Sequence, residues 1–508
     1  MSTMSRDESR ASTDANGSGR RYEEVCIVVS DLHLGEGMRV RVEYDGRRGI
    51  GRAWRALVRV ARRRKDKIED IENPLEGFLF DSEFSDFLDL MTERYGSTDA
   101  IRLKLLGDTF DPLTVTWQGR YEDPPYEHVG LDKMKRIIAG HPVFFGALAR
   151  FAGRSNHRID IFVGNHDLFL AWPSVRELLL KHVSGGDSGL LSRIRIIDHS
   201  QSFEEVDKQV LYVHGMDAEP HNEIDPKKAV VTDVLGVKLQ KPILNAPYGS
   251  YMFVDLGIPL KLHNKYLGRL REDRDVWKHA ARRQWLWGLY ALIRLIWHFI
   301  YAHFFSFWDF RRKASTRKIL DIVLATMTKH PVDKYALRLL KERECARVVV
   351  LGHSHKWKRD SGKDGTYLNT GTWTVSYRMF EREFELSWKR LQRFEPYWRT
   401  LQHFFRTGEV RFASRMIRFA ASLTAIAILG TFVAGGFWPI DSFQLKVMGG
   451  IAIVFMGLVM TFRLFSVEPR LVDDTKLTFG LIRHFDDGTL KADLMEYLPD
   501  EKDFRECV

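Results

Sequence analysis

Five short motifs in this sequence carry side chains that can bind divalent metal ions. Each contains Asp, His or Asn, and carboxylate, imidazole and amide oxygen groups are ligands for Mn, Fe, Zn and similar cations. In chain order the motifs are Asp31-Leu-His33, Gly107-Asp108, Gly164-Asn-His-Asp167, His214 and Gly352-His-Ser-His355. Because metal-binding side chains recur in five separate motifs, we predict that distant parts of the chain contribute to one metal site.

A short apolar run directly precedes each motif and predicts a buried strand that ends there. The runs are 25–29, 103–106, 159–163, 210–213 and 348–351. Open α/β sheets build their sites at the carboxyl ends of strands. Alternation along an extended segment is expected to place Asp31 and His33 on one side, and likewise His353 and His355. The adjacent glycines are expected to let the backbone approach the ions closely.

Each motif by itself has an ordinary structural explanation. An Asp-x-His pair matches by accident in many chains, and Gly107-Asp108 alone is a turn signal. His214 alone would be read as a partly buried histidine. The informative observation is the whole set in this order, with every member placed directly after an apolar strand. The set therefore predicts chemistry rather than packing alone.

The remaining patterns indicate a mixed α/β architecture. Helical patterns at 78–95 and 142–151 lie between the predicted strands, as in folds whose strands and helices alternate. Near the end of the sequence, segments 476–485 and 490–498 flank Asp486-Asp-Gly-Thr489 and predict a β-hairpin. We expect this hairpin to return to the sheet that carries the first motifs.

Composition sets broad limits on partners and compartment. With 44% hydrophobic and 28% charged residues in 508, the chain can bury a large core, which excludes global disorder. The net charge of +10 suits nucleic acid, acidic lipid or phosphorylated substrates without choosing among them. Three cysteines outside metal-binding spacing argue against a disulfide framework. The polar segment 1–21 is expected to be a disordered tail without a secretory signal.

The motifs resemble those of the calcineurin-like metallophosphoesterase superfamily, which carries Asp-x-His, Gly-Asp, Gly-Asn-His-[Asp/Glu], His and Gly-His-x-His in the same order. Segments 80–88 and 367–373 also look like flanking segments of its bacterial members. The resemblance covers about 22–215 and 340–380, and it implies an α/β/β/α sandwich with two sheets. Similarity to the UDP-2,3-diacylglucosamine pyrophosphatases is more distant, because these usually have Arg at the position of His166.

The resemblance also implies roles for individual residues. One metal ion would be bound by Asp31, His33 and His355, and the other by Asn165, His214 and His353, with Asp108 bridging both. We expect two divalent ions, Mn²⁺ first, with Fe or Zn as alternatives. Paired cations lower the pKa of a bound water and stabilise charge on phosphoryl oxygens. His166 would protonate the leaving group, and Asp167 would either orient His166 or simply cap the turn.

Two apolar stretches, 416–440 and 447–465, predict a transmembrane hairpin. Each is close to the roughly 20 residues that span a bilayer, and both contain small residues suited to helix packing. The alternative is a hairpin buried in a protein core. Basic residues flank the pair: Arg406, Arg411, Arg415 and Arg418 before it, and Arg463, Arg470 and Lys476 at or after its end. By the positive-inside rule, both ends are expected on the cytosolic side.

Three further segments predict helices at a membrane surface. The aromatic-rich segment 285–308 is long enough to span, but a single span would separate His353 and His355 from Asp31 by the bilayer, and Arg294 opposes it. We expect an interfacial or partly embedded helix there, or one buried in a cap domain or dimer. The basic segment 39–72 predicts a helix at 51–64 that lies on acidic lipid or in solvent. Segment 381–415 reads as a second surface helix.

These patterns predict six regions. A disordered tail (1–21) precedes the first part of the catalytic domain (22–215), an insertion (216–340) and the second part (341–380). An interfacial helix with the transmembrane hairpin (381–470) and the returning strands (471–508) follow. The expected function is hydrolysis of phosphoester or phosphoanhydride bonds at a cell membrane, with lipid as a partner and a lipid-linked nucleotide or glycolipid as substrate.

Two other classes of function stay open. The first is a phosphodiesterase that acts on soluble nucleotides or nucleic acid, although no RNA- or DNA-binding motif is present. The second is a membrane scaffold that has lost catalysis. A scaffold has no chemical need for seven ligand-type residues, so their presence favours an enzyme.

Overall fold

The computed structural model describes residues 22–41, 70–121, 125–197, 204–234, 237–263, 269, 331–343, 345–380 and 470–507. The chain divides into two compact units. The first comprises Met1–Trp277, Leu286–Arg378 and Asp473–Val508, and it contains nearly all the described residues. The second comprises Lys278–Trp285 and Met379–Val472 and is described only at 379–380 and 470–472.

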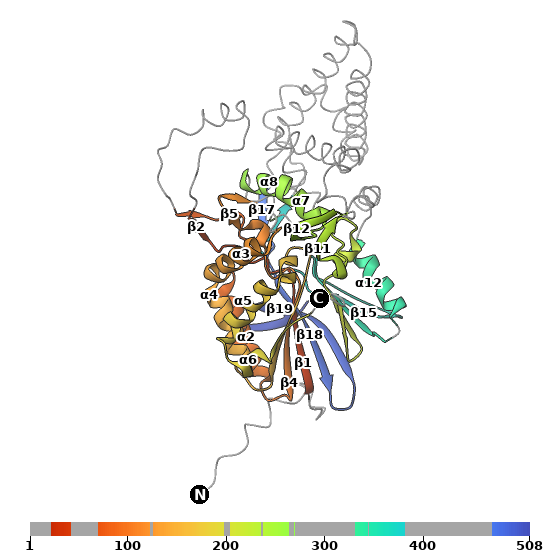
Figure 1. The fold of residues 1–508 in the computed structure, drawn as a ribbon. Coiled ribbons are helices and arrows are strands. Elements are labelled where there is room, and N and C mark those ends of the chain that lie inside the picture. The colour runs from red at the N-terminus through yellow and green to blue at the C-terminus, as the bar shows by residue number, and fades with distance from the viewer. Residues whose placement is uncertain are drawn as a thin grey trace, which may run out of the picture. The chain divides into compact units, whose positions relative to one another are not determined.

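The larger sheet has seven strands in the order β20-β19-β18-β1-β4-β7-β8 (Figure 1). Four of them are parallel: β1 (Tyr22–Val29), β4 (Ala100–Leu106), β7 (His157–Phe162) and β8 (Ile194–Ile196). Antiparallel strands extend the sheet from β1: β18 (Leu477–Phe485), β19 (Leu490–Leu498) and β20 (Asp503–Glu506). The last strands of the chain therefore lie in the same sheet as its first strand.

The smaller sheet has five strands in the order β14-β15-β13-β10-β9. Its three central strands are parallel: β15 (Gly365–Asn369), β13 (Val348–Leu351) and β10 (Val210–Val213). The edge strands β14 (Lys358–Gly362) and β9 (Glu204–Asp207) are antiparallel to their neighbours. Strands β1, β4, β7, β10 and β13 are the ones that the five apolar runs predict.

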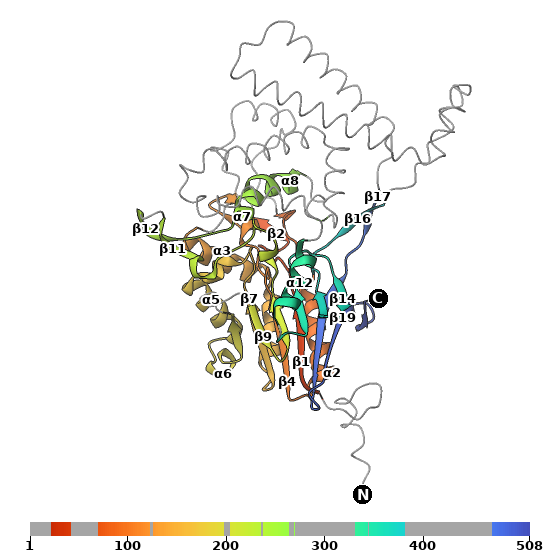
Figure 2. The same ribbon diagram turned by 90° about the vertical axis from the view of Figure 1, so that its right-hand side faces the viewer.

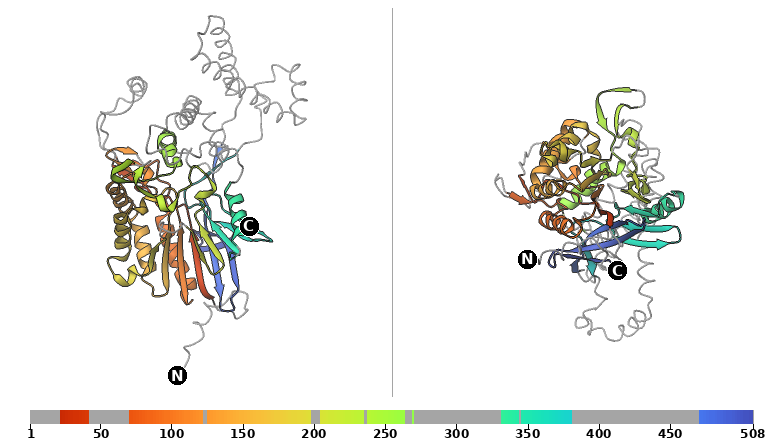
Figure 3. Two further views of the ribbon diagram at one scale, coloured as in Figure 1. Left: turned by 45° about the vertical axis from the view of Figure 1, so that its right-hand side comes forward. Right: turned by 90° about the horizontal axis from the view of Figure 1, so that it is seen from below.

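Both faces of the central strands are covered, which explains why β10 and β13 are apolar at every position and why β1 is apolar from Val25 to Val29. Along β1, Val25, Ile27 and Val29 belong to the core shared with helices, whereas Cys26 and Val28 belong to the core between the sheets. Helices α2 (Asp81–Tyr95), α3 (Glu127–Gly140), α4 (Pro142–Ala152) and α5 (Pro173–Ser184) cover the outer face of the larger sheet. Helix α12 (Pro331–Glu342) covers the smaller sheet on the opposite side (Figure 3).

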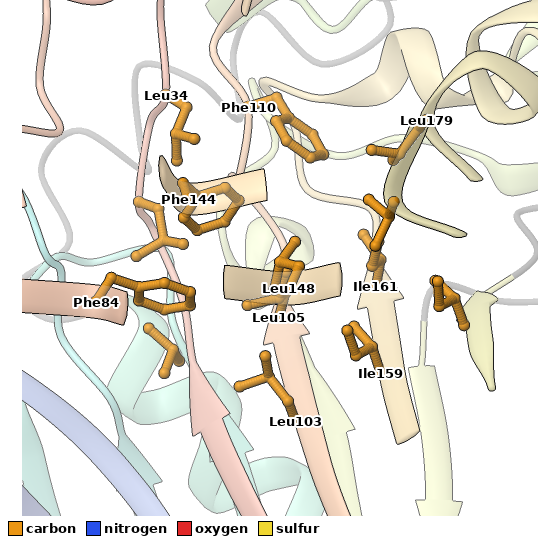
Figure 4. Close-up of a cluster of buried hydrophobic side chains, with 14 of the residues drawn as sticks. Leu34, Phe84, Leu103, Leu105, Phe110, Phe144, Leu148, Ile159, Ile161 and Leu179 are labelled. Atoms are coloured by element: carbon orange, nitrogen blue, oxygen red, sulfur yellow. The ribbon is translucent and has the colours of Figure 1, made fainter. Parts of the chain in front are cut away.

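The packing of α4 on the larger sheet shows how this core forms. Phe144 and Leu148 lie one turn apart on α4 and are fully buried. They pack over side chains of β4 and β7, among them Leu105 and Ile161 (Figure 4). Full burial of each such side chain stabilises the fold by about 1.5–3 kcal/mol before entropy is counted. The helix begins with Pro142, which is favourable in a first turn because that turn needs no backbone donor there.

A buried group of charged residues crosses the layer between the two sheets. Lys104 of β4 is fully buried, and its Nζ lies 3.2 Å from Asp160 Oδ2 and 2.8 Å from Glu205 Oε2. Arg195 donates from Nε to Asp160 Oδ1 at 2.9 Å. Because Lys104 and Asp160 lie in the larger sheet and Glu205 in the smaller, this charge cluster joins the two sheets.

Shorter elements lie at the carboxyl ends of the strands. A continuous helical segment is formed by α7 (Tyr248–Met252), the π-helical turn η5 (Phe253–Gly257) and α8 (Ile258–His263), and Figure 2 shows α7 and α8 beyond the ends of β1 and β4. Four strand pairs complete the fold: β2 (Arg39–Arg41) with β3 (Asp70–Glu72), β5 (Thr116–Trp117) with β6 (Arg120–Tyr121), β11 (Val230–Val234) with β12 (Val237–Leu244), and β16 (Tyr377–Phe380) with β17 (Arg470–Asp473).

The short helices are α6 (Ser188–Leu191) and the 3-10 turns η1 (Pro112–Thr114), η2 (Leu168–Ala171), η3 (Met216–Ala218) and η4 (Pro226–Lys228). The pairing of β16 with β17 places the two ends of segment 381–469 side by side. Beside this pair, Ser376 N donates to Thr475 Oγ1 at 3.1 Å. The described residues on either side of segment 381–469 are therefore adjacent.

The mixed α/β fold class that the sequence predicts is confirmed. The expected helices at 78–95 and 142–151 correspond to α2 and α4, and the expected C-terminal hairpin to β18 and β19. The predicted spans at 416–440 and 447–465, and the predicted helices at 51–64, 285–308 and 381–415, lie outside the described residues. Among the helices that the structure does describe, none combines the length and apolar character needed to cross a bilayer.

Candidate metal centre

The ends of five strands from both sheets meet at one place. Asp31 and Asp108 follow β1 and β4 in the larger sheet, and His214 and His353 follow β10 and β13 in the smaller. Backbone hydrogen bonds hold neighbouring ends together: Asp31 N donates to Gly107 O at 3.1 Å and Gly352 N to His214 O at 3.0 Å. A further hydrogen bond at this place runs between the two sheets, from His353 N to Asp31 Oδ2 at 2.8 Å.

Three groups of His and carboxylate side chains have ligand atoms within 4.8 Å of one another, and the third, His33 with Asp111 and His166, shares His33 with the first. The first group is Asp31, His33 and His355, where His33 Nε2 lies 3.0 Å from His355 Nε2 and His355 Nε2 lies 3.3 Å from Asp31 Oδ1. The second group is Asp108, His214 and His353, where His214 Nε2 lies 3.4 Å from Asp108 Oδ2. Each group supplies oxygen and imidazole ligands without thiolate, a set that suits Mn, Fe and Zn alike.

Asp108 lies between the two groups. Its Oδ2 is 3.4 Å from His214 Nε2 in one group and 3.9 Å from His33 Nε2 in the other. Its Oδ1 accepts a hydrogen bond from His166 N at 2.9 Å, which fixes the orientation of the carboxylate. A single carboxylate oxygen therefore faces both groups.

Three buried ligand-type atoms at this place make no hydrogen bond within the part of the chain that the structure describes. They are Asp31 Oδ1, Asn165 Oδ1 and His214 Nε2. An unsatisfied buried polar atom costs about 1–3 kcal/mol, and native proteins contain few of them. Cations bound here would satisfy all three atoms, so the residues present fit two divalent metal ions.

The backbone at the ligands is left-handed, whereas the sequence predicted extended segments. The φ angles are 54° at Asp31, 53° at His33, 50° at Asp108, 67° at His353 and 57° at His355. Such a conformation is uncommon outside glycine, costs about 1–3 kcal/mol per residue, and collects at functional sites. Asp31 and His33 still join one group, but His353 and His355 belong to different groups, contrary to the expectation that they lie on one side. A left-handed turn at each ligand, instead of strand alternation, gives these placements.

The glycines of the motifs make room for side chains of neighbouring strands. A Cβ on Gly164 would lie 2.2 Å from Asp108 Oδ1, and one on Gly352 would lie 2.4 Å from Asp31 Oδ2. The sequence predicted that these glycines let the backbone approach the ions. Their observed role is to let the carboxylates of β1 and β4 fit between the strand ends.

Outer contacts orient three of the histidine rings: hydrogen bonds for His214 and His353, and a longer ion-pair contact for His33. His214 Nδ1 lies 2.9 Å from Leu106 O, His353 Nε2 lies 3.2 Å from Glu219 Oε2, and His33 Nδ1 lies 3.6 Å from Asp111 Oδ2. A partner on one ring nitrogen fixes the tautomer and leaves the other nitrogen for a metal ion. Burial lowers the pKa of His214, but the Asp108 carboxylate outweighs it and raises that pKa to about 10 without metal.

His166 has a different carboxylate partner from the one that we expected. Its Nδ1 lies 3.0 Å from Asp111 Oδ1. The Asp167 carboxylate instead accepts hydrogen bonds from Gly164 N at 2.5 Å and Thr109 N at 2.9 Å. The expectation that Asp167 orients His166 is therefore corrected: Asp167 has the turn-capping geometry that was its alternative, and Asp111 holds the ring.

The Asp111 contact also sets the charge of His166. Burial lowers the pKa of His166, but the carboxylates of Asp111 and Asp108 outweigh this and raise it to about 9 in the metal-free protein. The sequence patterns missed Asp111 and Glu219. Asp111 stands three residues after Asp108, and Glu219 stands five residues after His214. This proximity in sequence could have marked both as candidate carboxylates of the site, but it does not reveal which histidine ring each one contacts.

Comparison with known proteins does not add to this geometry. No protein-family model, no curated protein and no solved structure matches the chain. The case for a metal centre therefore depends on the chain's own residues: two adjoining His and carboxylate groups with Asp108 between them.

Proposed function

We propose that this protein is a hydrolase of phosphoester or phosphoanhydride bonds that uses two divalent metal ions. The observation that carries the proposal is the position of Asp108 Oδ2, which faces His33 on one side and His214 on the other. One carboxylate shared by two ligand groups is what a dinuclear centre requires. Two cations there would lower the pKa of a bound water and balance the charge on phosphoryl oxygens.

The residues would divide the work as follows. Asp31, His33 and His355 would bind one ion, Asn165, His214 and His353 the other, and Asp108 both. His166 would donate its proton to the leaving oxygen as the phosphorus–oxygen bond breaks, and the Asp111 carboxylate 3.0 Å from its Nδ1 favours the protonated ring. Asp111 thereby acts as a positioning residue, and Glu219 would orient His353 in the same way.

The order of layers supports a calcineurin-like α/β/β/α sandwich. Helices α2 to α5 cover one sheet, the second sheet covers its other face, and α12 covers the far side. The five motifs stand at the strand ends in the order of that superfamily. We therefore propose this fold family, with Mn²⁺ as the first ion to test and Fe or Zn as alternatives.

We also propose that the enzyme is anchored to a membrane with its catalytic domain on the cytosolic side. The apolar stretches at 416–440 and 447–465 support this. The adjacent ends of segment 381–469, held by β16 and β17, fit an even number of spans. A lipid-linked nucleotide or glycolipid is the substrate class that such an anchor suits. This part fails if vesicle-bound diphosphates stay intact while soluble nucleotides are cleaved efficiently.

Hydrolysis of a chromogenic phosphodiester and a chromogenic phosphomonoester with Mn²⁺ tests the activity. Detergent-purified full-length protein is compared with Asp31→Asn, His166→Ala and the exposed control Asp500→Asn. We expect Asp31→Asn to abolish turnover, His166→Ala to reduce it by about 10²–10⁴-fold, and the control to be unchanged. Equal turnover in all four proteins, or bound metal with no turnover on any phosphorylated substrate, would instead favour a non-catalytic scaffold.

A further inference from the structure

One face of the helical segment above the metal centre carries an unusual set of residues. Phe253, Gly257 and Lys261 follow one another at intervals of four across the π-helical turn η5 and α8. The Phe253 ring contacts the His166 ring edge to face, with centroids 5.4 Å apart. This face is thereby in direct contact with the proposed proton donor.

Gly257 lets the Lys261 side chain lie along this face. A Cβ at Gly257 would stand 2.7 Å from Phe253 Cδ2, so a side chain there would displace the ring. Lys261 Nζ lies 4.5 Å from the centre of the Phe253 ring. Helical side chains lean toward the N-terminus of their helix, so Lys261 points back toward Phe253 and His166. The turn therefore presents an ammonium group beside the metal centre.

Lys261 has no carboxylate partner within ion-pair distance among the described residues. Burial lowers its pKa, and the nearest charges that act on it are Asp111, which raises the pKa, and Arg269, which lowers it. Asp111 already contacts His166 and His33. A partly buried cation without a partner of its own is costly, so its retention needs a reason.

Arg269 adds a second cation of the same kind. Its Nη2 donates to Glu76 O at 3.0 Å, and it too forms no ion pair with a described carboxylate. The next residue, Gly77, has its Cβ position 3.5 Å from His33 Cβ, so Arg269 is held by the loop that packs on His33. Lys261 and Arg269 are thus both connected to the group formed by His33, Asp111 and His166. Lys261 reaches it through the Phe253 ring, and Arg269 through the loop at Glu76 and Gly77.

We infer that Lys261 and Arg269 form a subsite for an anionic group on the leaving side of the substrate, such as a second phosphate. The inference depends on the proposed function, because His166 defines the leaving side as the proton donor. Lys261 and Arg269, which have no ion-pair partner among the described carboxylates, would form charge-assisted hydrogen bonds to phosphate oxygens. A diphosphate then gains contacts that a phosphomonoester with an uncharged leaving group lacks.

Two readouts test the subsite on full-length protein loaded with Mn²⁺. The first is kcat/KM for ADP and for p-nitrophenyl phosphate, and the second is the affinity for methylenediphosphonate and for methylphosphonate by calorimetry. The variants are Lys261→Met, Arg269→Met and the exposed control Lys228→Met from the same insertion. Because Lys261→Met removes a cation without an ion-pair partner, thermal stability should not fall, which separates this effect from unfolding.

We expect Lys261→Met to lower kcat/KM for ADP by about 10- to 100-fold and to change that for p-nitrophenyl phosphate by less than about threefold. Lys261→Met should also make the affinity for methylenediphosphonate no higher than that for methylphosphonate. Arg269→Met should likewise lower kcat/KM for ADP and the affinity for methylenediphosphonate. Equal losses on both substrates, or no preference for the diphosphonate in the wild type, would overturn the subsite while the hydrolase stands. A retained preference without turnover on either substrate would support the subsite and reject the hydrolase.

Discussion

Two clusters of buried charged residues in this molecule differ in how their atoms are paired. In the charge cluster between the sheets, Lys104 contacts Asp160 and Glu205, and Arg195 contacts the same two carboxylates. All of these residues lie on regular strands. In the metal centre, Asp31, Asn165 and His214 each keep a buried ligand atom without a hydrogen bond, and the backbone is left-handed at five ligands.

This difference in pairing distinguishes charged residues that stabilise the fold from charged residues that are arranged to bind a ligand. A paired cluster is complete within the protein, so its removal should change stability alone. An unpaired cluster on strained backbone is incomplete without a further group, so changes there should affect binding and chemistry first. Burial and charge by themselves do not distinguish the two cases, because both clusters are buried.

The largest effect is expected from Asp108→Asn. Turnover should fall by about 10³-fold or more, because the shared ligand loses its charge. The free energy of unfolding of the metal-free protein at about pH 10.5 should change by only about 1 kcal/mol, because His214 and His166, whose pKa values are about 10 and about 9, are then mostly neutral with or without the Asp108 charge. The chromogenic assay measures the loss of turnover, and urea denaturation measures the change in the free energy of unfolding. A large loss of stability would place Asp108 with the structural charges.

The opposite pattern is expected from Lys104→Met. Removal of Lys104 leaves the Asp160 and Glu205 carboxylates with Arg195 as their remaining cation, which costs about 3–5 kcal/mol of the free energy of unfolding. Turnover per folded molecule should be unchanged, because the cluster lies away from the ligands. Urea denaturation measures the loss, and the double variant Lys104→Met/Asp160→Leu should recover part of it. Retained stability with lost turnover would contradict the distinction between the clusters.

A smaller effect is expected from Asp111→Asn. Since the Asp111 carboxylate raises the pKa of His166, its loss should lower that pKa and move the basic limb of the pH–rate profile to lower pH. Turnover at neutral pH should fall by about 10- to 100-fold. The control variant Asp167→Asn should not move the basic limb of the pH–rate profile, because Asp167 caps a turn and does not contact the His166 ring. A shift for Asp167→Asn alone would restore the original assignment.

The sequence placed the strands and most ligands because these depend on local patterns. The apolar runs before Asp31, Asp108 and His214 are buried on both faces, so their periodicity is visible without the fold. The left-handed turns at Asp31 and His355 were not predicted. The apolar pattern of a strand contains no information about the backbone conformation of the polar residues that follow it.

Partners across the fold were the least predictable part of the site. Asp167 is adjacent to His166 in sequence and was therefore the natural candidate to hold it, yet Asp111 from another strand end contacts the ring. Glu219 and Lys261 come from the insertion, where no motif marks them. Which residue faces a given ring nitrogen depends on how elements pack, and this is decided only when the chain is folded.

The smallest effect concerns His141, a buried imidazole that belongs with the paired charges. Its Nδ1 lies 3.0 Å from Asp81 Oδ2, and its Nε2 lies 3.5 Å from Glu76 Oε2. Burial lowers the pKa of His141, but these two carboxylates outweigh it and raise the pKa from 6.5 to about 9. The stabilisation is then complete below about pH 6.5 and is lost as pH rises through about 9.

Denaturation at several pH values measures this loss, which should amount to about 2 kcal/mol between pH 6.5 and 9.5. His141→Gln should flatten that part of the profile, whereas the control His128→Gln should not. An unchanged slope in His141→Gln would show that His141 does not carry its proton in the folded protein.

The most direct test of the dinuclear centre is the amount and state of bound manganese. Full-length protein is loaded with Mn²⁺, freed of excess ion, and examined by elemental analysis and electron paramagnetic resonance. The geometry predicts two ions per chain with an exchange-coupled signal, and Asp108→Asn should lose the coupling. Absence of bound metal, or one magnetically isolated ion per chain, would contradict the shared centre.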